Sequence, residues 1–386
     1  MTNERLDILL YGHDGRGLGH VSRSVAIGMA IRRLYPHLNI CLLTGCRQTG
    51  ELIGNAELDW IKLPAYDTEV VDGTSTGVDG PAGFEDKELG RFRAEQIRQI
   101  VALYRPRLIL ADHSPQGKHR ELVPALHDDI PDKPRWVLGM RGVVGTVAQT
   151  QSDLAIELFK TRYDMLLWYG DSTVLGAGHK ELLNVRFDTE AVECGYVSRL
   201  AEQEYVVQPA GYRQYGCTVS IPWFSRDTEL FFTNLVEAVS MIGSRFGPFR
   251  FFLGGEGFVA MSQQLQGLDF CSAEPFGDQY IHALCASRSA LIFGGYNSLV
   301  DILSTGIPAL VVKRSMADKE QQEHLDALLG SMESRLIPVD EAGCSVEMLY
   351  RGFQDILELS PDSFAHPVNI GGAETAARIL FELLDE

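Results

Sequence analysis

The chain has 386 residues and a formal net charge of −18, with 45% hydrophobic and 22% charged residues. That length exceeds one ordinary hydrophobic core, so we expect a globular protein of two domains. Lys and Arg form no long runs, which argues against a nucleic-acid partner and against docking on an anionic membrane, because both rely on clustered cations.

Cysteine usage and hydropathy indicate the compartment. The seven cysteines are odd in number, form no CxxC pair, and lie partly inside apolar runs such as Ile40–Leu43. Buried reduced thiols of this kind are typical of cytosolic proteins. No apolar run reaches the roughly 18 residues of a membrane helix, and no signal peptide precedes the first predicted strand. We therefore expect a cytoplasmic protein without an integral membrane segment.

The first half of the chain alternates short apolar runs with longer amphipathic stretches, which is typical of parallel α/β units. Amphipathic stretches between the runs predict helices, for example over 20–35 and 88–105. The alternation breaks between Gln203 and Gly216, where Pro209, two glycines and two tyrosines predict a linker. Strands are predicted over 6–12, 38–43, 107–111, 135–139 and 164–169.

A second alternating series follows the linker. Strands are predicted over 217–221, 249–253, 268–271, 289–293 and 308–312, and helices over 227–245, 297–305, 319–330 and 372–385. The fold class is therefore α/β, with two Rossmann-like, doubly wound parallel sheets. Domain boundaries are expected at 1–205 and 206–368, with 369–386 a terminal helix that packs back on the N-terminal domain. Parallel sheets bind ligands at the carboxyl ends of their strands, so a cleft between facing sheets is the expected site.

A glycine-rich loop, Gly12–His20, follows the first strand and opens the first helix. Its glycine spacing matches neither the dinucleotide-binding GxGxxG motif nor the P-loop. His20 starts the helix, where a neutral imidazole could take a proton from an acceptor hydroxyl, or could only cap the helix. His13 reads as a structural or substrate-orienting residue. The expected acceptor-side residues are Gly17, Gly19, His13 and His113.

The second loop, Phe293–Ser298, joins a strand to a helix that begins near Asn297. Backbone N–H groups at a helix start attract a diphosphate, here those of Tyr296, Asn297 and Ser298. Asp301 lies four residues after Asn297 on the same helical face, where a carboxylate could accept both ribose hydroxyls. Gln321 and Gln322 offer the paired donors and acceptors that suit a sugar. The alternative is a plain strand–turn–helix with surface amides.

The spacing of these parts resembles family 28 glycosyltransferases, and more closely a group of predicted bacterial glycosyltransferases. The resemblance spans nearly the whole chain, but only the block 293–325 is specific enough to stand alone. The motifs that carry it are Gly-Leu-Gly-His (17–20), Ala-Asp-His-Ser-Pro-Gln-Gly (111–117), Val-Leu-Gly-Met-Arg (137–141), Tyr-Gly-Asp (169–171), Gly-Tyr-Val (195–197), Gly-Gly-Tyr-Asn-Ser (294–298) and Gly-Ile-Pro-Ala-Leu-Val-Val (306–312).

This resemblance implies the two-lobed GT-B fold and a site that binds a nucleoside-diphosphate sugar. His20 would correspond to the histidine of the family's N-terminal glycine-rich loop, and Asp301 would replace a ribose-binding glutamate. The other residues that it implies are Gly294, Gly295, Tyr296, Asn297 and Ser298 at the diphosphate, Arg199 near the phosphates, Gln321 and Gln322 at the donor sugar, and Phe276 and Gly277 at the nucleobase.

One segment departs from the family pattern. Relatives have a glycine-rich loop after the first strand of the C-terminal lobe, whereas this chain has Val219–Ser225. Glycines there would let backbone amides reach the donor phosphates, and Pro222 removes one amide altogether. Trp223 and Phe224 could instead stack on a sugar or fill part of the cleft. The departure leaves the donor's binding mode open.

The expected function is that of an inverting hexosyltransferase of GT-B type. A hexose or N-acetylhexosamine would move from a nucleoside-diphosphate sugar, by default a UDP-sugar, to an acceptor hydroxyl or amine. His20, or Asp112 if the fold brings it close, would deprotonate the acceptor. No Asp-x-Asp loop is poised to hold a divalent ion, so neither metal nor another cofactor is expected. The alternatives are a sugar-nucleotide 2-epimerase of the same fold and a non-catalytic protein that binds a nucleotide sugar.

The acceptor is expected on the N-terminal lobe, as a small molecule, natural product or glycan. The loop 66–90 holds seven acidic residues against Lys87 alone. That excess could select a cationic acceptor such as an amino sugar, or the loop could simply be solvated. The donor sugar, the acceptor and the oligomeric state do not follow from the sequence.

Overall fold

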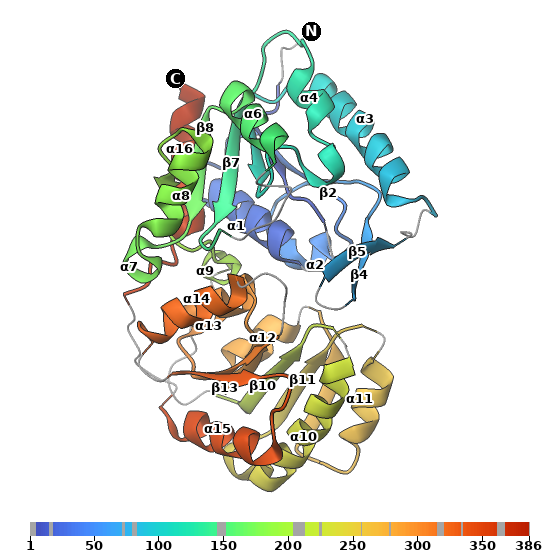
Figure 1. Ribbon diagram of the computed structural model, residues 1–386, viewed down its shortest axis with the longest axis vertical. Coiled ribbons are helices and arrows are strands. Elements are labelled where there is room, and N and C mark those ends of the chain that lie inside the picture. Colours follow the sequence, from blue (N-terminus) through green and yellow to red (C-terminus); the bar gives the residue numbers. More distant parts are fainter. Residues whose placement is uncertain are drawn as a thin grey trace. The chain divides into compact units, whose positions relative to one another are not determined.

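A computed structural model describes residues 5–14, 18–71, 74–78, 83–144, 152–203, 213–223, 226–255, 257–277, 279–314, 320–332, 335–360 and 367–385. The chain divides into two compact units, each built around its own sheet (Figure 1). Unit 1 comprises Met1–Gln203 with Asn369–Glu386, and unit 2 comprises Glu204–Val368.

The sheet of unit 1 has seven strands in the order β3-β2-β1-β6-β7-β8-β9, and every pairing is parallel. Consecutive parallel strands need crossover connections, and helices supply most of them. The strands are β1 (Ile8–Tyr11), β2 (Ile40–Thr44), β3 (Trp60–Lys62), β6 (Leu108–Asp112), β7 (Arg135–Arg141), β8 (Met165–Tyr169) and β9 (Val192–Glu193). The helices are α1 (Gly19–Leu34), α2 (Thr49–Ile53), α3 (Asp86–Tyr104), α4 (Val123–His127), α6 (Asp153–Arg162), α7 (Ser172–Leu175), α8 (Gly178–Phe187) and α9 (Arg199–Glu202), with a 3₁₀ turn at Lys118–Arg120.

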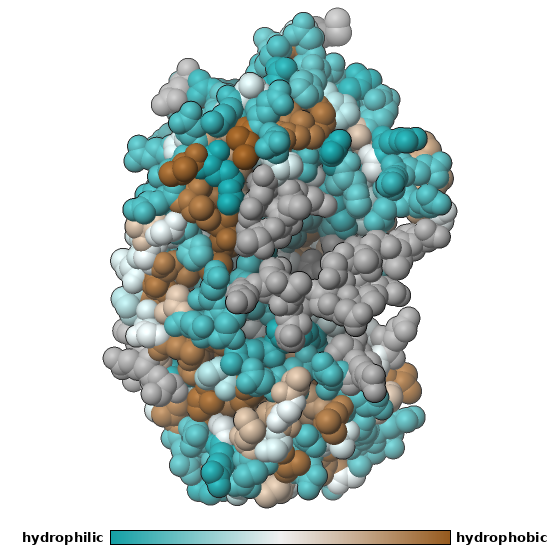
Figure 2. Space-filling view, viewed as in Figure 1, coloured by the Kyte–Doolittle hydropathy of each residue, from teal (hydrophilic) through white to brown (hydrophobic). Residues whose placement is uncertain are grey.

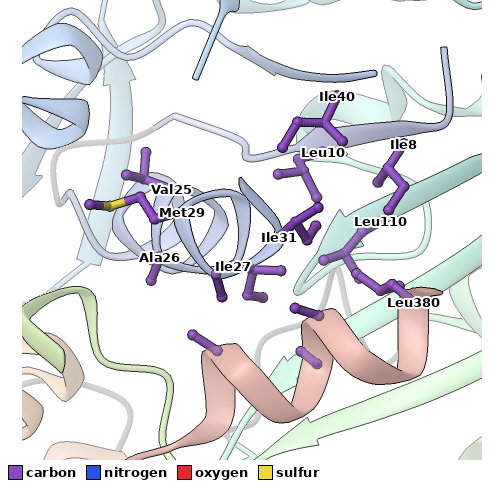
Figure 3. Close-up of a cluster of buried hydrophobic side chains, with 14 of the residues drawn as sticks. Ile8, Leu10, Val25, Ala26, Ile27, Met29, Ile31, Ile40, Leu110 and Leu380 are labelled. Carbon is purple, nitrogen blue, oxygen red and sulfur yellow. The ribbon is translucent and has the colours of Figure 1, made fainter. Parts of the chain in front are cut away.

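Both faces of this sheet are buried, because side chains of a strand point alternately to opposite faces. Ile8 and Leu10 of β1 belong to one hydrophobic cluster, whereas Leu9 and Tyr11 belong to another. Figure 3 shows the first cluster, where Leu10 and neighbouring strand residues meet the apolar side of α1. The four buried residues of β1 explain why its run is continuously apolar rather than alternating.

The last helix, α16 (Gly372–Asp385), belongs to unit 1 although residues 204–368 precede it in the chain. Its apolar side, which includes Ala376 and Leu380, lies in the same cluster as α1 (Figure 3). The chain enters this helix beside Gly195: the Tyr196 amide donates to the carbonyl of Asn369 over 2.8 Å. The return of the terminal helix thereby completes the core beneath α1.

The acidic segment 66–90 contains regular structure, which corrects its interpretation as a loop. It forms an antiparallel hairpin of β4 (Asp67–Val71) and β5 (Thr74–Val78), followed by the first turn of α3. The hairpin sequence has acidic residues and threonines in place of a continuous apolar run, so hydropathy did not predict its two strands. Asp86 and Glu88 lie in the first turn of α3, where the helix dipole favours negative charge.

The sheet of unit 2 has six parallel strands in the order β12-β11-β10-β13-β14-β15. The strand predicted over 268–271 is wrong: the chain turns at 268–270, and the edge strand begins only at Cys271. The prediction was misplaced because the strongly apolar residues, Leu268 and Phe270, lie in the turn before the strand. The strands are β10 (Tyr215–Ile221), β11 (Phe249–Leu253), β12 (Cys271–Pro275), β13 (Ser287–Phe293), β14 (Ala309–Lys313) and β15 (Leu336–Asp340). The helices are α10 (Arg226–Ile242), α11 (Phe258–Gln264), α12 (Gln279–Cys285), α13 (Tyr296–Thr305), α14 (Glu320–Leu329) and α15 (Val346–Glu358), with a 3₁₀ turn at Gly243–Phe246.

Two parallel-sheet α/β units confirm the predicted fold class. On the face drawn in Figure 2, hydrophilic residues cover most of the described surface, with hydrophobic patches between them. Among the described helices, none is both long and apolar enough to cross a membrane.

Candidate active site

A cluster of polar residues lies at the carboxyl edge of the unit 1 sheet, where β1, β6 and β7 are neighbours. His13 follows the end of β1, Asp112 is the last residue of β6, and Arg141 is the last residue of β7. His20 lies in the first turn of α1, which begins just after the glycine-rich loop. Parallel strands bring their carboxyl ends to one edge, so residues far apart in sequence meet here.

His20 and Asp112 form a direct pair. Nδ1 of His20 lies 2.6 Å from Oδ2 of Asp112, and Arg23 donates from Nη2 to the same oxygen over 2.8 Å and from Nε to Oδ1 over 3.1 Å. Nη2 of Arg23, which can only donate, also lies 2.9 Å from Nδ1 of His20. The shorter contact is with the carboxylate, which can only accept, and it favours a proton on Nδ1; in that tautomer the lone pair is on Nε2. Asp112 and Arg23 are 3% and 2% exposed, whereas His20 is 20% exposed, so only His20 is accessible to a substrate.

Two further histidines surround His20. The ring centroids of His13 and His113 lie 3.8 and 5.1 Å from that of His20. Burial lowers the pKa of all three imidazoles well below the usual 6.5, and the cations Arg23 and Arg141 lower the pKa of His20 further. A neutral His20 at ordinary pH is the form that can accept a proton.

A buried ion network supports this corner of the sheet. Arg93 donates from Nη1 to Oδ1 of Asp14 over 2.5 Å and from Nη2 to Oε1 of Glu121 over 2.9 Å. Glu121 also accepts from the hydroxyls of Tyr11 and Tyr66. The side chains of Arg93 and Glu121 are both 0% exposed. Asp14 lies next to His13, so the network fixes the start of the glycine-rich loop.

The other predicted acceptor-side residues are only partly described. Gly17 lies outside the described residues, and Gly19 is the first residue of α1. His113 has φ +72°, a left-handed backbone that is uncommon for a residue with a side chain, and its amide donates to the Gly139 carbonyl over 2.7 Å. In the acidic segment 66–90, Asp67 pairs with Arg47 and Asp86 with His119.

The carboxyl edge of the unit 2 sheet holds the second group of predicted residues. Gly294 and Gly295 follow β13 directly, and α13 begins at Tyr296. The Gly294 amide donates to the Val312 carbonyl over 3.1 Å and the Gly295 amide to the Phe293 carbonyl over 2.8 Å. These two amides are therefore engaged within the chain, and what the glycines contribute is space: a Cβ at Gly295 would meet no atom within 4 Å.

Helices α13 and α14 carry the predicted ribose and sugar contacts. The Tyr296 ring stacks on the His324 ring at a centroid distance of 5.6 Å, which joins the start of α13 to α14. Gln322 donates to Asp326 over 2.6 Å, and Gln321 is half-buried. Asp301 lies in the middle of α13 and contributes to raising the pKa of the Cys285 thiol to about 11, after burial of that thiol.

Phe276 and Gly277 follow β12 at the same edge. The Phe276 ring packs against Phe252 and Tyr280, at centroid distances of 6.2 and 5.3 Å. A Cβ at Gly277 would meet no atom within 4 Å, so its backbone borders open space.

Arg199 lies in unit 1 as the first residue of α9, and its Nη1 donates to the Leu52 carbonyl at the end of α2 over 3.2 Å. The family resemblance implied that this side chain lies near the phosphates of the donor. In the structure the guanidinium has at least one backbone acceptor within its own unit.

The segment that departs from the family pattern is fixed by an arginine that the sequence reasoning missed. Arg314 follows β14, and its Cζ lies 4.3 Å from the ring centroid of Trp223. Its Nη2 donates to the Trp223 carbonyl over 3.2 Å, and its Nε lies 2.6 Å from Oε2 of Glu341. A Cβ at Gly254, after β11, would clash with the Pro222 carbonyl. The one signal in the sequence was position. Arg314 directly follows β14, and Glu341 directly follows β15.

Among the residues that the structure describes, no three His, Cys, Asp or Glu side chains gather in a way that could hold a metal ion.

No family model and no curated protein sequence matches this chain. Solved structures do match it over almost its whole length. MurG of Acinetobacter baumannii has a TM-score of 0.54 at 11% identity, and covers 97% of this chain and 99% of its own. UDP-GlcNAc 2-epimerase of Methanocaldococcus jannaschii, in complex with UDP-GlcNAc and UDP, has a TM-score of 0.60 at 11% identity, covering 98% and 99%.

A plant protein gives a similar match. UGT71G1 of Medicago truncatula, complexed with UDP-glucose, has a TM-score of 0.59 at 11% identity and covers 100% of this chain and 98% of its own. At such low identity these likenesses establish the architecture rather than the reaction. The chain is therefore similar in fold to GT-B enzymes that handle UDP-sugars, among them both glycosyltransferases and 2-epimerases.

Proposed function

We propose that this chain is a glycosyltransferase that moves a hexose or N-acetylhexosamine from a nucleoside-diphosphate sugar to an acceptor hydroxyl or amine. The default donor is a UDP-sugar, since UDP, UDP-glucose or UDP-GlcNAc is bound in several of the similar structures. The observation that carries the proposal is the pairing of His20 with Asp112 over 2.6 Å, with Nε2 of the imidazole left to act as base.

The proposed reaction is a single displacement at the anomeric carbon. His20 Nε2 takes the proton of the acceptor hydroxyl while the acceptor oxygen forms a bond to the anomeric carbon from the face opposite the diphosphate. The bond between that carbon and the diphosphate oxygen breaks, so the configuration inverts and the nucleoside diphosphate departs. Asp112 holds the imidazole in the required tautomer and stabilises the imidazolium that forms.

The donor is assigned to unit 2. The start of α13 after Gly294 and Gly295 would bind the diphosphate, because the helix dipole and the N–H groups of a first turn favour negative charge. Asp301 would accept the ribose hydroxyls, and Gln321 and Gln322 would contact the sugar. We propose no metal in this step, since the charge of the leaving group can be stabilised by the helix start and by cationic side chains.

A sugar-nucleotide 2-epimerase is the second candidate, and the structural likeness favours it as much as a transferase. Two epimerases match at TM-scores of 0.62 and 0.63, above the 0.54 of MurG. An epimerase breaks a bond at C2 of the sugar and needs no acceptor, whereas a transferase leaves C2 untouched.

The test is incubation of the protein with UDP-GlcNAc and UDP-glucose, each with and without a panel of hydroxyl and amine acceptors. A transferase releases UDP and forms a product heavier by one sugar only when the acceptor is present. Conversion of the donor alone to its C2 epimer, with deuterium entering at C2 in heavy water, would instead identify an epimerase. His20→Ala serves as the matched inactive control.

A further inference from the structure

The guanidinium of Arg314 is held between two aromatic rings in unit 2. Its Cζ lies 4.3 Å from the ring centroid of Trp223 and 4.3 Å from that of Phe293. The side chain is 7% exposed, and its acidic partner Glu341 is 3% exposed. Stacking of this kind stabilises a cation while leaving the edge of its plane available for hydrogen bonds.

Only part of that edge is used. Nε and Nη2 donate to the two carboxylate oxygens of Glu341 over 2.6 and 2.8 Å. Nη2 also contacts the Thr228 hydroxyl over 3.1 Å and the Trp223 carbonyl over 3.2 Å. The third nitrogen, Nη1, is buried and has no hydrogen-bond partner among the described residues. Buried donors are usually paired, and the described part of the chain offers Nη1 of Arg314 no acceptor, which leaves this nitrogen available to a ligand.

The strand register places Arg314 beside the loop that precedes α13. Phe293 pairs with Val312 across β13 and β14, so Gly294 and Gly295 leave β13 beside the end of β14, where Lys313 is the last strand residue and Arg314 follows it. The Gly294 amide donates to the Val312 carbonyl over 3.1 Å, which holds the two chain segments together. A Cβ at Gly295 would meet no atom within 4 Å. Open space and an unpaired cationic nitrogen therefore occur at neighbouring positions of one sheet edge.

We propose that Arg314 binds the diphosphate of the sugar nucleotide through Nη1. This inference rests on the function proposed above and names a residue at the diphosphate that the sequence did not indicate. The guanidinium would supply hydrogen bonds that Pro222 cannot, because proline has no amide hydrogen to donate. Glu341 and Thr228 orient the guanidinium, and the two rings keep it in place. Since Nη1 is buried, the atoms that shield it from solvent move aside when a phosphate oxygen binds.

The experiment measures the affinity of the full chain for UDP and for uridine by titration calorimetry. Arg314→Gln alone would leave Glu341 as an unpaired buried carboxylate and could unfold the unit. Glu341→Gln alone would likewise leave the buried Arg314 guanidinium without a carboxylate. The informative variant is therefore the double variant Arg314→Gln/Glu341→Gln, which removes both charges of the pair. Arg250→Gln is the matched control, because Arg250 also pairs with a glutamate, Glu274, but lies near the opposite end of its strand. Thermal melts establish that each variant is folded.

A phosphate ligand and a structural ion pair give opposite results. If Arg314 binds the diphosphate, the double variant binds UDP roughly tenfold to a hundredfold more weakly than the wild type, as expected for a lost charge-assisted hydrogen bond, and binds uridine equally well. Arg250→Gln leaves both affinities unchanged.

Equal UDP affinity in the double variant and the wild type would overturn the inference and leave the proposed function standing. A folded wild type that binds neither UDP nor another nucleoside diphosphate would overturn the proposed function itself, and the inference with it.

Discussion

Oδ2 of Asp112 lies 2.6 Å from Nδ1 of His20, although 92 residues separate them in the sequence. Asp112 ends β6, and His20 lies in the first turn of α1, which follows β1; β1 and β6 are neighbours in the sheet. The sequence presented the two residues as alternative bases. In the proposed function they have different roles, because Asp112 is buried and ion-paired with Arg23, whereas His20 is partly exposed.

The first prediction separates these roles. His20→Ala should lower kcat by about a hundredfold to ten-thousandfold, the usual contribution of a general base, and should leave the affinity for UDP unchanged. Asp112→Asn should lower kcat as well, since the amide no longer fixes the imidazole tautomer. Steady-state kinetics and calorimetry measure the two effects. His127→Ala, at an exposed position on α4, is the control and should retain full activity. A wild-type rate in His20→Ala would reject the base.

Sequence reasoning located strands such as β1 and β6, which end at the candidate active site, because these strands are continuously buried. It failed where burial is incomplete: β12 is a half-exposed edge strand, and β4 and β5 lack an apolar run. The roles within each site depend on contacts between distant segments. Neither the spacing of His20 and Asp112 nor that of Trp223 and Arg314 carries information about their distance, which the order of the strands in the sheet determines.

The second prediction concerns pH. The pKa of His20 is lowered well below its usual 6.5 by burial and by Arg23, Arg141 and Lys118. The basic form is the active one, so kcat/KM should stay constant as the pH falls through 6.5 and should decline only in more acid solution. A pH–rate profile between pH 4 and 9, spanning that usual value, measures this. An acid limb centred at or above 6.5 would show that the imidazole is not held neutral.

The same three histidines predict how stability depends on pH. His13, His20 and His113 all have a lowered pKa in the folded chain, so the unfolded chain binds more protons below pH 6.5. Their contribution to the free energy of unfolding is therefore present above 6.5 and is lost as the pH falls toward their folded values. Urea unfolding at a series of pH values should show this loss. Replacing His113 with Asn should make the free energy of unfolding fall less steeply with decreasing pH.

The third prediction concerns the ribose. Asp301→Ala should weaken UDP binding, since a carboxylate that accepts two ribose hydroxyls contributes about tenfold or more to affinity. The effect on inorganic pyrophosphate should be small, because that ligand has no ribose. Asp269→Ala, an exposed aspartate of the same unit, is the matched control. Equal UDP affinity in Asp301→Ala and the wild type would place the ribose elsewhere.

The fourth prediction concerns the buried network beside the glycine-rich loop. Glu121 accepts hydrogen bonds from Tyr11, Tyr66 and Arg93, and burial raises its pKa. Glu121→Gln would leave the fully buried Arg93 with Asp14 as its one remaining carboxylate among the described partners. Breaking a buried ion pair in this way should lower the free energy of unfolding by about 3–5 kcal/mol, as measured by urea denaturation.

Glu95→Gln is the control for this change, because Glu95 pairs with Arg98 on the exposed side of α3, where solvent screens the charges. It should leave the unfolding midpoint nearly unchanged. Both arginines lie on α3, so a loss of stability confined to Glu121→Gln would assign the effect to burial rather than to the helix. Similar midpoints for the two variants would mean that the tyrosine hydroxyls, and not the Arg93 charge, determine the stability of this corner.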